Sequence, residues 1–167
     1  MVPVADDAAR QDEGRLRSTG GRRSVARLAA VQALYQLELN PEIPAGAVVR
    51  EFVLHRFDKE IDGDRLAEAD GQFFAEVVEG AAADRAQLDA EISAALVEDW
   101  PLARLDAVLR AILRAGTWEL MQRRDVPPRV SISEYTGIAH AFFAGKEPGF
   151  ANGVLDRLGR LLRSDEM

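Results

Sequence analysis

Five arginines near the start of the chain are the residues best suited to bind a charged ligand: Arg15, Arg17, Arg22, Arg23 and Arg27. The surrounding stretch, residues 14–37, contains no Asp or Glu, although the whole chain has a net charge of -7. Guanidinium groups bind phosphates, and counterion release makes such basic segments typical of nucleic-acid surfaces. A solvated, flexible basic arm without a partner is the alternative that charge alone leaves open.

The remaining polar residues do not indicate catalysis or metal binding. The two histidines, His55 and His140, lie on separate expected helices, and neither belongs to a catalytic or metal-binding motif. The chain has no cysteine, which excludes thiolate ligands and disulfides. Residues 58–70 hold six acids, but a lysine and an arginine interrupt them, and the glycine is misplaced for an EF-hand loop. We therefore expect a solvated loop there, no metal, no cofactor and no enzymatic activity.

Length and composition indicate a folded helical protein. Of the 167 residues, 47% are hydrophobic and 7% are aromatic, which suffices for a core and favours helices over strands. No apolar run approaches the ~20 residues that span a bilayer, and the N-terminus lacks the apolar centre of a signal peptide. We expect a soluble cytoplasmic protein with a flexible polar tail at residues 1–20 and one helical domain at 21–167.

Apolar residues recur at helical spacing through the rest of the chain. They predict helices at about 22–39, 46–57, 66–83, 88–97 and 101–123. A sixth helix is expected after a capping box of Ser131 and Glu134, and a seventh after residues 150–153. No stretch alternates like a strand, so the predicted fold class is all-α with about seven helices. Gly80, within the third helix, predicts a close helix crossing.

The first helix would place the basic residues at the surface. Its pattern predicts a buried face made of Val25, Leu28, Gln32, Tyr35 and Leu39. Arg23 and Arg27 lie four residues apart on the opposite side and are expected to face solvent. Leu34 falls on the arginine side, which predicts contacts with neighbours on two sides of this helix.

Four segments resemble the family of the bacterial transcription antitermination factor NusB. They are RRSVARLAAVQALYQLE at 22–38, LARLDAVLRAILRAGTWEL at 102–120, DVPPRVSISEYTGIAHAF at 125–142 and FANGVLDRL at 150–158. With the helices between them they cover nearly the whole chain from about residue 21. The resemblance implies two three-helix sub-bundles packed at a steep angle, with one additional helix.

The resemblance also implies a function without catalysis. NusB proteins bind the boxA element, a single-stranded RNA segment of nascent ribosomal RNA transcripts, as heterodimers with NusE, which is also a ribosomal small-subunit protein. The pair helps to load an antitermination complex onto RNA polymerase with NusA and NusG. A homodimer of the free protein is a further state that the sequence leaves open.

Six residues correspond to RNA contacts in the family: Arg22, Arg23, Arg27, Lys146, Phe150 and Asn152. A lysine can meet phosphate, an exposed aromatic ring can stack on an unpaired base, and an amide can read a base edge. Two of these residues have structural alternatives. Phe150 can act as a hydrophobic staple, and Asn152 can cap the seventh helix.

The NusE surface corresponds, by the same resemblance, to exposed parts of the first and fifth helices. It would include Tyr35, Asp106 and Arg110, and an acidic group there would suit a basic ribosomal partner. The alternatives are an ordinary surface ion pair between Asp106 and Arg110, and a half-buried core position for Tyr35.

Two other functions remain open from the sequence. Similar helical domains precede ribosomal RNA cytosine methyltransferase domains, so the chain could be an accessory domain whose catalytic part lies on a second chain. It could also be an interaction module, such as a homodimer, without an RNA site of its own. Salt-dependent RNA binding distinguishes these functions from antitermination, because only a phosphate-binding site loses affinity steeply with salt.

Overall fold

The computed structural model describes residues 4–57, 69–96 and 100–167, with side chains from residue 21 onward. Within this part the chain forms seven α-helices, two short 3-10 helices and no strand, which confirms the all-α class. The helices are α1 (Val4–Leu39), α2 (Ala45–His55), α3 (Gly71–Ala83), α4 (Arg85–Ala95), α5 (Ala107–Gln122), α6 (Pro128–Phe142) and α7 (Glu147–Leu162). The 3-10 helices are η1 (Leu102–Arg104) and η2 (Ser164–Glu166). None of the described helices is long and apolar enough to cross a membrane.

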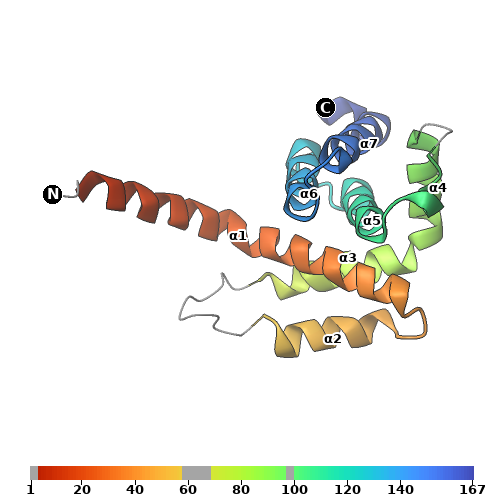
Figure 1. The fold of residues 1–167 in the computed structure, drawn as a ribbon, viewed down its shortest axis with the longest axis horizontal. Helices are drawn as coiled ribbons and strands as arrows, with labels where there is room; N and C mark the ends of the chain where they lie inside the picture. The colour runs from red at the N-terminus through yellow and green to blue at the C-terminus, as the bar shows by residue number, and fades with distance from the viewer. Residues whose placement is uncertain (1–3, 58–68, 97–99) are drawn as a thin grey trace.

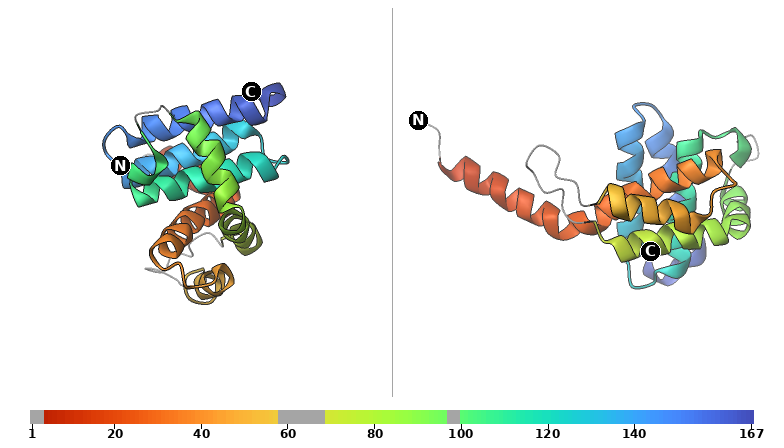
Figure 2. Two further views of the ribbon diagram at one scale, coloured as in Figure 1. Left: turned by 90° about the vertical axis from the view of Figure 1, so that its right-hand side faces the viewer. Right: turned by 90° about the horizontal axis from the view of Figure 1, so that it is seen from below.

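The helices form two groups of three, as expected. Helices α1, α2 and α3 pack on one another, and α5, α6 and α7 form the second group (Figure 1). The two groups cross steeply, since one is seen side-on where the other is seen nearly end-on (Figures 1 and 2). Helix α4 packs against α5 and α7. The groups meet mainly where α1 and α3 contact α5, so α1 has neighbours on more than one side.

This position between the two groups explains why the predicted buried face of α1 is wrong. Gln32 and Leu39 are exposed, and Val25, Leu28 and Tyr35 are only partly buried. The buried residues of the helix are Ala26, Arg27, Ala29, Ala30, Val31, Ala33 and Leu34. Small alanine side chains let α1 approach α3 and α5 closely. The side of α1 that is buried is therefore its alanine-rich side, which looked less hydrophobic in the sequence.

Several helices begin at other residues than the sequence predicted. Helix α1 begins at Val4, and its first part extends away from the other helices (Figure 1). Helix α6 begins at Pro128, so Ser131 and Glu134 lie inside it and do not form a capping box. Helix α5 begins at Ala107 instead of Pro101, and α7 begins at Glu147, before Phe150. The division into a flexible tail at 1–20 and a domain at 21–167 stays a prediction, and most of the acidic stretch at 58–70 lies outside the described residues.

Gly80 marks a close crossing, as the sequence predicted. A Cβ atom built on Gly80 of α3 would lie 2.3 Å from the indole ring of Trp118 on α5. Trp118 is only 8% exposed, so its ring has little room to move away. The contact between α3 and α5, and with it the junction of the two groups, depends on the missing side chain at this position.

We predict that Gly80→Ala lowers the free energy of unfolding by about 1–3 kcal/mol, because overpacking outweighs the better helix propensity of alanine. Gly137→Ala in α6 is the matched control, since nothing lies within 4 Å of its Cβ position and the helix there is exposed. That variant should be as stable as the parent or more stable. Thermal unfolding followed by circular dichroism measures both, and a Gly80→Ala protein that melts no earlier than the parent would contradict the close crossing.

Candidate nucleic-acid interface

Arg27 lies in the interior, so the prediction that it faces solvent is wrong. Its side chain is 3% exposed, and the Glu119 side chain on α5 is fully buried. The Arg27 guanidinium donates to Glu119 Oε1 from Nε at 3.0 Å and from Nη2 at 2.7 Å. The Ser131 hydroxyl donates to the same oxygen at 3.0 Å. Arg27 therefore joins α1 to α5 and α6, which is a structural role.

Neighbouring groups extend this buried network. Ser24 donates to the Glu134 carboxylate at 2.9 Å, and Glu134 lies 3.7 Å from the Arg27 guanidinium. Burial lowers the pKa of Arg27, but the hydrogen bonds and the charge of Glu119 outweigh that effect and raise it. Burial raises the pKa of the Tyr135 hydroxyl well above its usual value, and the charge of Glu119 adds to the shift. The network thus combines the Arg27–Glu119 ion pair with the Glu134 carboxylate and the hydroxyl groups of Ser24, Ser131 and Tyr135.

Arg22 and Arg23 remain at the surface. Arg22 is exposed, and its backbone carbonyl accepts from the amide of Asp70 at 3.1 Å. The Arg23 side chain is 41% exposed and makes long ion pairs with Asp70 at 3.7 Å and Asp125 at 3.9 Å. Its guanidinium lies 4.9 Å from the centre of the Phe73 ring, a cation–π contact. The structure therefore places these two arginines where α1 meets the start of α3 and the turn after α5.

The turn between α5 and α6 brings a further arginine, Arg123, to this place, and sequence analysis missed it. Arg123 donates to Asp125 from Nε at 2.9 Å, and its guanidinium lies 5.0 Å from the Phe73 ring centre. Arg124, the next residue, is exposed, and its charge acts on Glu166 near the C-terminus. The hydrogen bond from Arg123 holds the pKa of Asp125 at about 2, so Asp125 stays charged and partly neutralises the arginines. Only the fold could reveal this cluster, because about a hundred residues separate its members in sequence.

Lys146 and Phe150 line a second site at the start of α7. Both border a pocket of about 390 Å³ together with Trp100, Leu105, Leu109 and Glu147. The ring of Phe150 is half-buried, and its centre lies 6.2 Å from that of Trp100. Lys146 itself is exposed. The structure therefore brings together two of the predicted RNA contacts and adds Trp100, to which the sequence analysis assigned no binding role.

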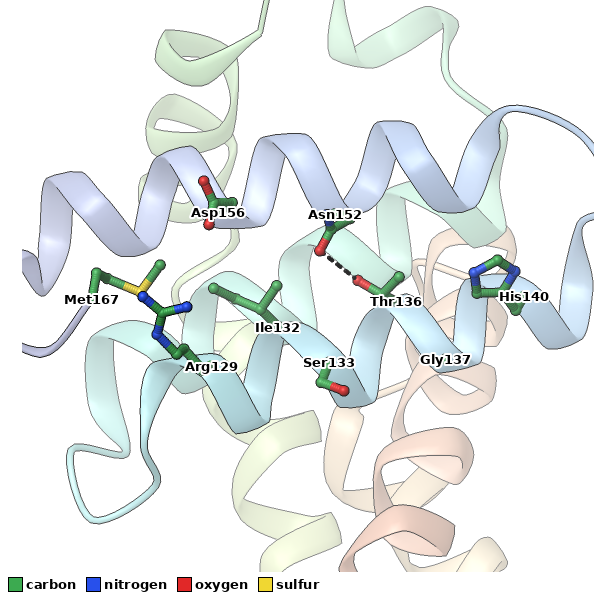
Figure 3. Close-up of a pocket in the computed structure, with 9 residues that line it drawn as sticks. All are labelled: Arg129, Ile132, Ser133, Thr136, Gly137, His140, Asn152, Asp156 and Met167. Carbon is green, nitrogen blue, oxygen red and sulfur yellow. Dashed lines mark hydrogen bonds between the residues drawn. The ribbon is translucent and has the colours of Figure 1, made fainter.

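Asn152 lies in a third place, the groove between α6 and α7 (Figure 3). It is inside α7, so it does not cap that helix. Its Oδ1 accepts from the Thr136 hydroxyl at 3.4 Å, and its side chain is otherwise exposed (Figure 3). His140 borders the same groove, whereas His55 is exposed at the end of α2. Within the described ranges, no three His, Asp or Glu residues are grouped so as to hold a metal ion.

The three residues expected at the NusE surface have different environments. Arg110 pairs with Glu38 of α1 instead of Asp106, donating from Nε at 2.9 Å. Arg114 also pairs with Glu38, at 2.8 Å, and these arginines lower the pKa of Glu38 although burial raises it. Asp106 is exposed and caps α5 by accepting from the Val108 amide at 2.8 Å. Tyr35 is half-buried against the core, which matches its structural alternative.

Comparison with known proteins identifies the family. The NusB family matches residues 24–160 of this chain. The chain belongs to the NusB family. The transcription antitermination protein NusB of Brucella ovis is 50% identical over 151 residues, which cover 88% of this chain and 85% of that protein. NusB of Caulobacter vibrioides is 52% identical over 138 residues, which cover 83% and 92%.

Solved NusB structures have the same fold. T. maritima NusB superposes with a TM-score of 0.71 at 28% identity, covering 86% of this chain and 95% of that one. A crystal structure of the antitermination factors NusB and NusE in complex with double-stranded RNA gives a TM-score of 0.68 at 25% identity, covering 83% and 96%. The NusB match contains the Arg27–Glu119 pair and the Lys146 pocket, but it begins two residues after Arg22.

We predict that Arg27→Met lowers the free energy of unfolding by about 3–5 kcal/mol, because it leaves the Glu119 carboxylate buried without its counter-charge. The double variant Arg27→Met, Glu119→Gln should recover part of this loss, since the amide is neutral and its oxygen can still accept from Ser131. Urea denaturation measures both. Arg160→Met, which removes an exposed ion pair with Asp156, is the control and should change stability by less than about 0.5 kcal/mol. Equal effects of Arg27→Met and Arg160→Met would show that the buried pair is not important for stability.

Proposed function

We propose that this NusB-family chain is a transcription antitermination factor that binds single-stranded boxA RNA of nascent ribosomal RNA transcripts together with NusE. In this role it would help to assemble the antitermination complex on RNA polymerase with NusA and NusG, in the cytoplasm and without catalysis. The antitermination proteins from Brucella and Caulobacter support this proposal by their identity of about half over most of the chain. A solved NusB neighbour that contains NusE and RNA supports the choice of partners.

The observation that carries the proposal is the arginine cluster at the junction of α1, α3 and the α5–α6 turn. It consists of Arg22, Arg23 and Arg123 on a chain of net charge -7, and Arg123 is held there by Asp125 and Glu76. The ion pairs of Arg23 are longer than 3.5 Å, and its acidic partners are partly exposed. Such pairs contribute little to stability, so phosphates can replace the carboxylates at small cost. The RNA backbone would then bind here by charge and counterion release.

Lys146, Phe150 and Asn152 would extend this contact along the molecule. Lys146 can bind a further phosphate, and the half-buried ring of Phe150 offers one edge to an unpaired base. The amide of Asn152 makes only a long hydrogen bond to Thr136, so it can exchange this bond for one to a base or a ribose. Arg27 has no direct role in the proposed contact, because its guanidinium is bound inside the core.

The NusE contact would use charge at the start of α5. Asp106 is the exposed acid among the three expected residues, whereas Arg110 is held by Glu38 and Tyr35 packs on the core. An exposed carboxylate at this end suits a basic ribosomal protein and would accelerate association. Arg110 would act indirectly, because it donates to the carbonyl of Ala103 at 3.2 Å and so positions η1 beside Asp106.

We predict that the double variant Arg22→Gln, Arg23→Gln weakens binding of a labelled boxA RNA and lowers the salt dependence. Each lost phosphate contact reduces the slope of log affinity against log salt by about 0.7 for single strands, so two contacts reduce it by about 1.4. Fluorescence anisotropy at four salt concentrations, with NusE present, measures this slope. The same titration with a duplex shows which form of RNA the protein prefers.

The matched control is Arg85→Gln, Arg160→Gln, which removes the same charge from two exposed arginines of α4 and α7. Its salt slope should equal that of the parent protein. A parent protein that binds no RNA at any salt concentration, with or without NusE, would leave the fold intact but rule out the RNA function. The interaction-module alternative would then be preferred.

We predict that Asp106→Asn slows association with NusE and leaves stability unchanged. Asparagine is as good an N-cap as aspartate, so the hydrogen bond to Val108 survives while the charge is lost. Stopped-flow or surface-based kinetics at low salt should show a lower association rate, and the difference should shrink at high salt. Asp165→Asn, an exposed acid near the C-terminus, is the control. If both variants associate at the parent rate, Asp106 lies outside the NusE surface.

A further inference from the structure

The pocket beside the start of α7 has the features of a site for one flat ring. Its floor consists of Leu105, which follows η1, and Leu109 of α5, and both are buried. Two aromatic residues border it, Trp100 just before η1 and Phe150 in the first turns of α7. Their ring centres are 6.2 Å apart and the rings are inclined by 43°, so the two rings contact each other at an angle, and both border the pocket. The volume of about 390 Å³ lies in the range of small-ligand sites.

Trp100 is the unusual member of this group. Its side chain is 57% exposed, although tryptophan is normally among the most buried residues by area. Trp118, the second tryptophan of the chain, is 8% exposed and packs against Gly80. Packing in the core therefore accounts for a tryptophan at position 118. Trp100 has no such role in the core, because more than half of its surface is in contact with water.

The charged groups at the rim distinguish between possible occupants. Lys146 is exposed beside the two rings and can bind a phosphate outside the pocket. Glu147 also lines the pocket, but its Oε2 is buried and lies against Gly145, 2.9 Å from where a Cβ would be. The negative charge of this carboxylate disfavours a phosphate inside the pocket and leaves the aromatic surfaces for an uncharged base. The arrangement therefore suits a nucleotide whose base points inward and whose phosphate points outward.

We propose that Trp100 and Phe150 together form a stacking site for a single unpaired RNA base, with Lys146 on its phosphate. This inference rests on the proposed RNA function and deepens it by assigning a base-binding role to Trp100. Base–aromatic stacking is tolerant of sequence, because every base has a π-face, so the site would accept any of the four bases.

Tryptophan emission tests the site directly, because stacking of a base on an indole ring quenches its fluorescence. The complex of this protein with NusE is titrated with boxA RNA while anisotropy of the RNA and tryptophan emission are recorded together. Trp100→Phe supplies the background from Trp118 and from NusE. We expect emission of Trp100 to fall along the same curve as the rise in anisotropy.

Substitutions separate stacking from packing. Trp100→Ala should weaken RNA binding roughly 5- to 150-fold, as expected for the loss of one stacked base, and should leave the salt slope unchanged. Trp100→Phe retains an aromatic face and should bind within about threefold of the parent protein. Leu161→Ala, which removes an exposed apolar side chain at the far end of α7, is the control and should bind as the parent does. Circular dichroism verifies that all variants are folded.

The outcomes are distinct. RNA that binds without quenching, together with unchanged affinity of Trp100→Ala, would overturn the stacking site while leaving the RNA function in place. Quenching by NusE alone, with no further change on adding RNA, would assign the pocket to a protein side chain and also overturn the proposal. Absence of any anisotropy change would refute the RNA function itself and the stacking site with it. A set of RNAs, each lacking one base, would identify the stacked base. Removal of that base should weaken RNA binding to the parent protein but leave RNA binding to the Trp100→Ala protein unchanged.

Discussion

The guanidinium of Arg27 and the carboxylate of Glu119 meet in the interior where the two helix groups join. Both side chains have lost their water, and several kcal/mol of desolvation per ion are recovered only if the pair stays together with its hydrogen bonds. The hydrogen bond from Ser131, together with the nearby Glu134 that Ser24 binds, ties three helices to this one contact. A shift of α1 by one turn would separate the charges, so the pair determines the register of α1 against α5 and α6.

The same contact places the proposed RNA-binding surface. Arg23 lies one helical turn before Arg27, so fixing Arg27 inside fixes Arg23 at the edge of the junction. The close approach of α3 to α5 at Gly80 brings Phe73 and Asp70 to that edge. The arginines of the cluster therefore come from two separate segments, Asp70 and Phe73 come from a third, and the geometry of the cluster depends on the core beneath it.

Charge pairing also explains how an acidic protein can offer a basic surface. Many arginines of the described residues form ion pairs with carboxylates or hydrogen bonds with carbonyl groups, as Arg114 does with Glu38 and Asp89. Arg163 is buried in this way and donates to the carbonyl of Val126 at 2.8 Å. Pairs at the surface are weak and screened by salt, whereas buried pairs are not. Only the pairs at the surface can be exchanged for phosphates at small cost, so burial, and not sequence, separates the structural arginines from those proposed to bind RNA.

The sequence by itself determined the helical class, the family and the close crossing at Gly80. Helical periodicity, capping residues and the absence of strand patterns are local properties, and four long segments carried the resemblance to NusB. Local patterns could not show which side of α1 is buried, because its alanine-rich side with Arg27 looks polar until a partner is known. The partner, Glu119, lies 92 residues away, and only the tertiary structure brought it there. The same limit explains Ser131 and Glu134, which resembled a helix cap but serve the buried network, and Trp100, whose exposure became meaningful only when the fold placed it beside Phe150.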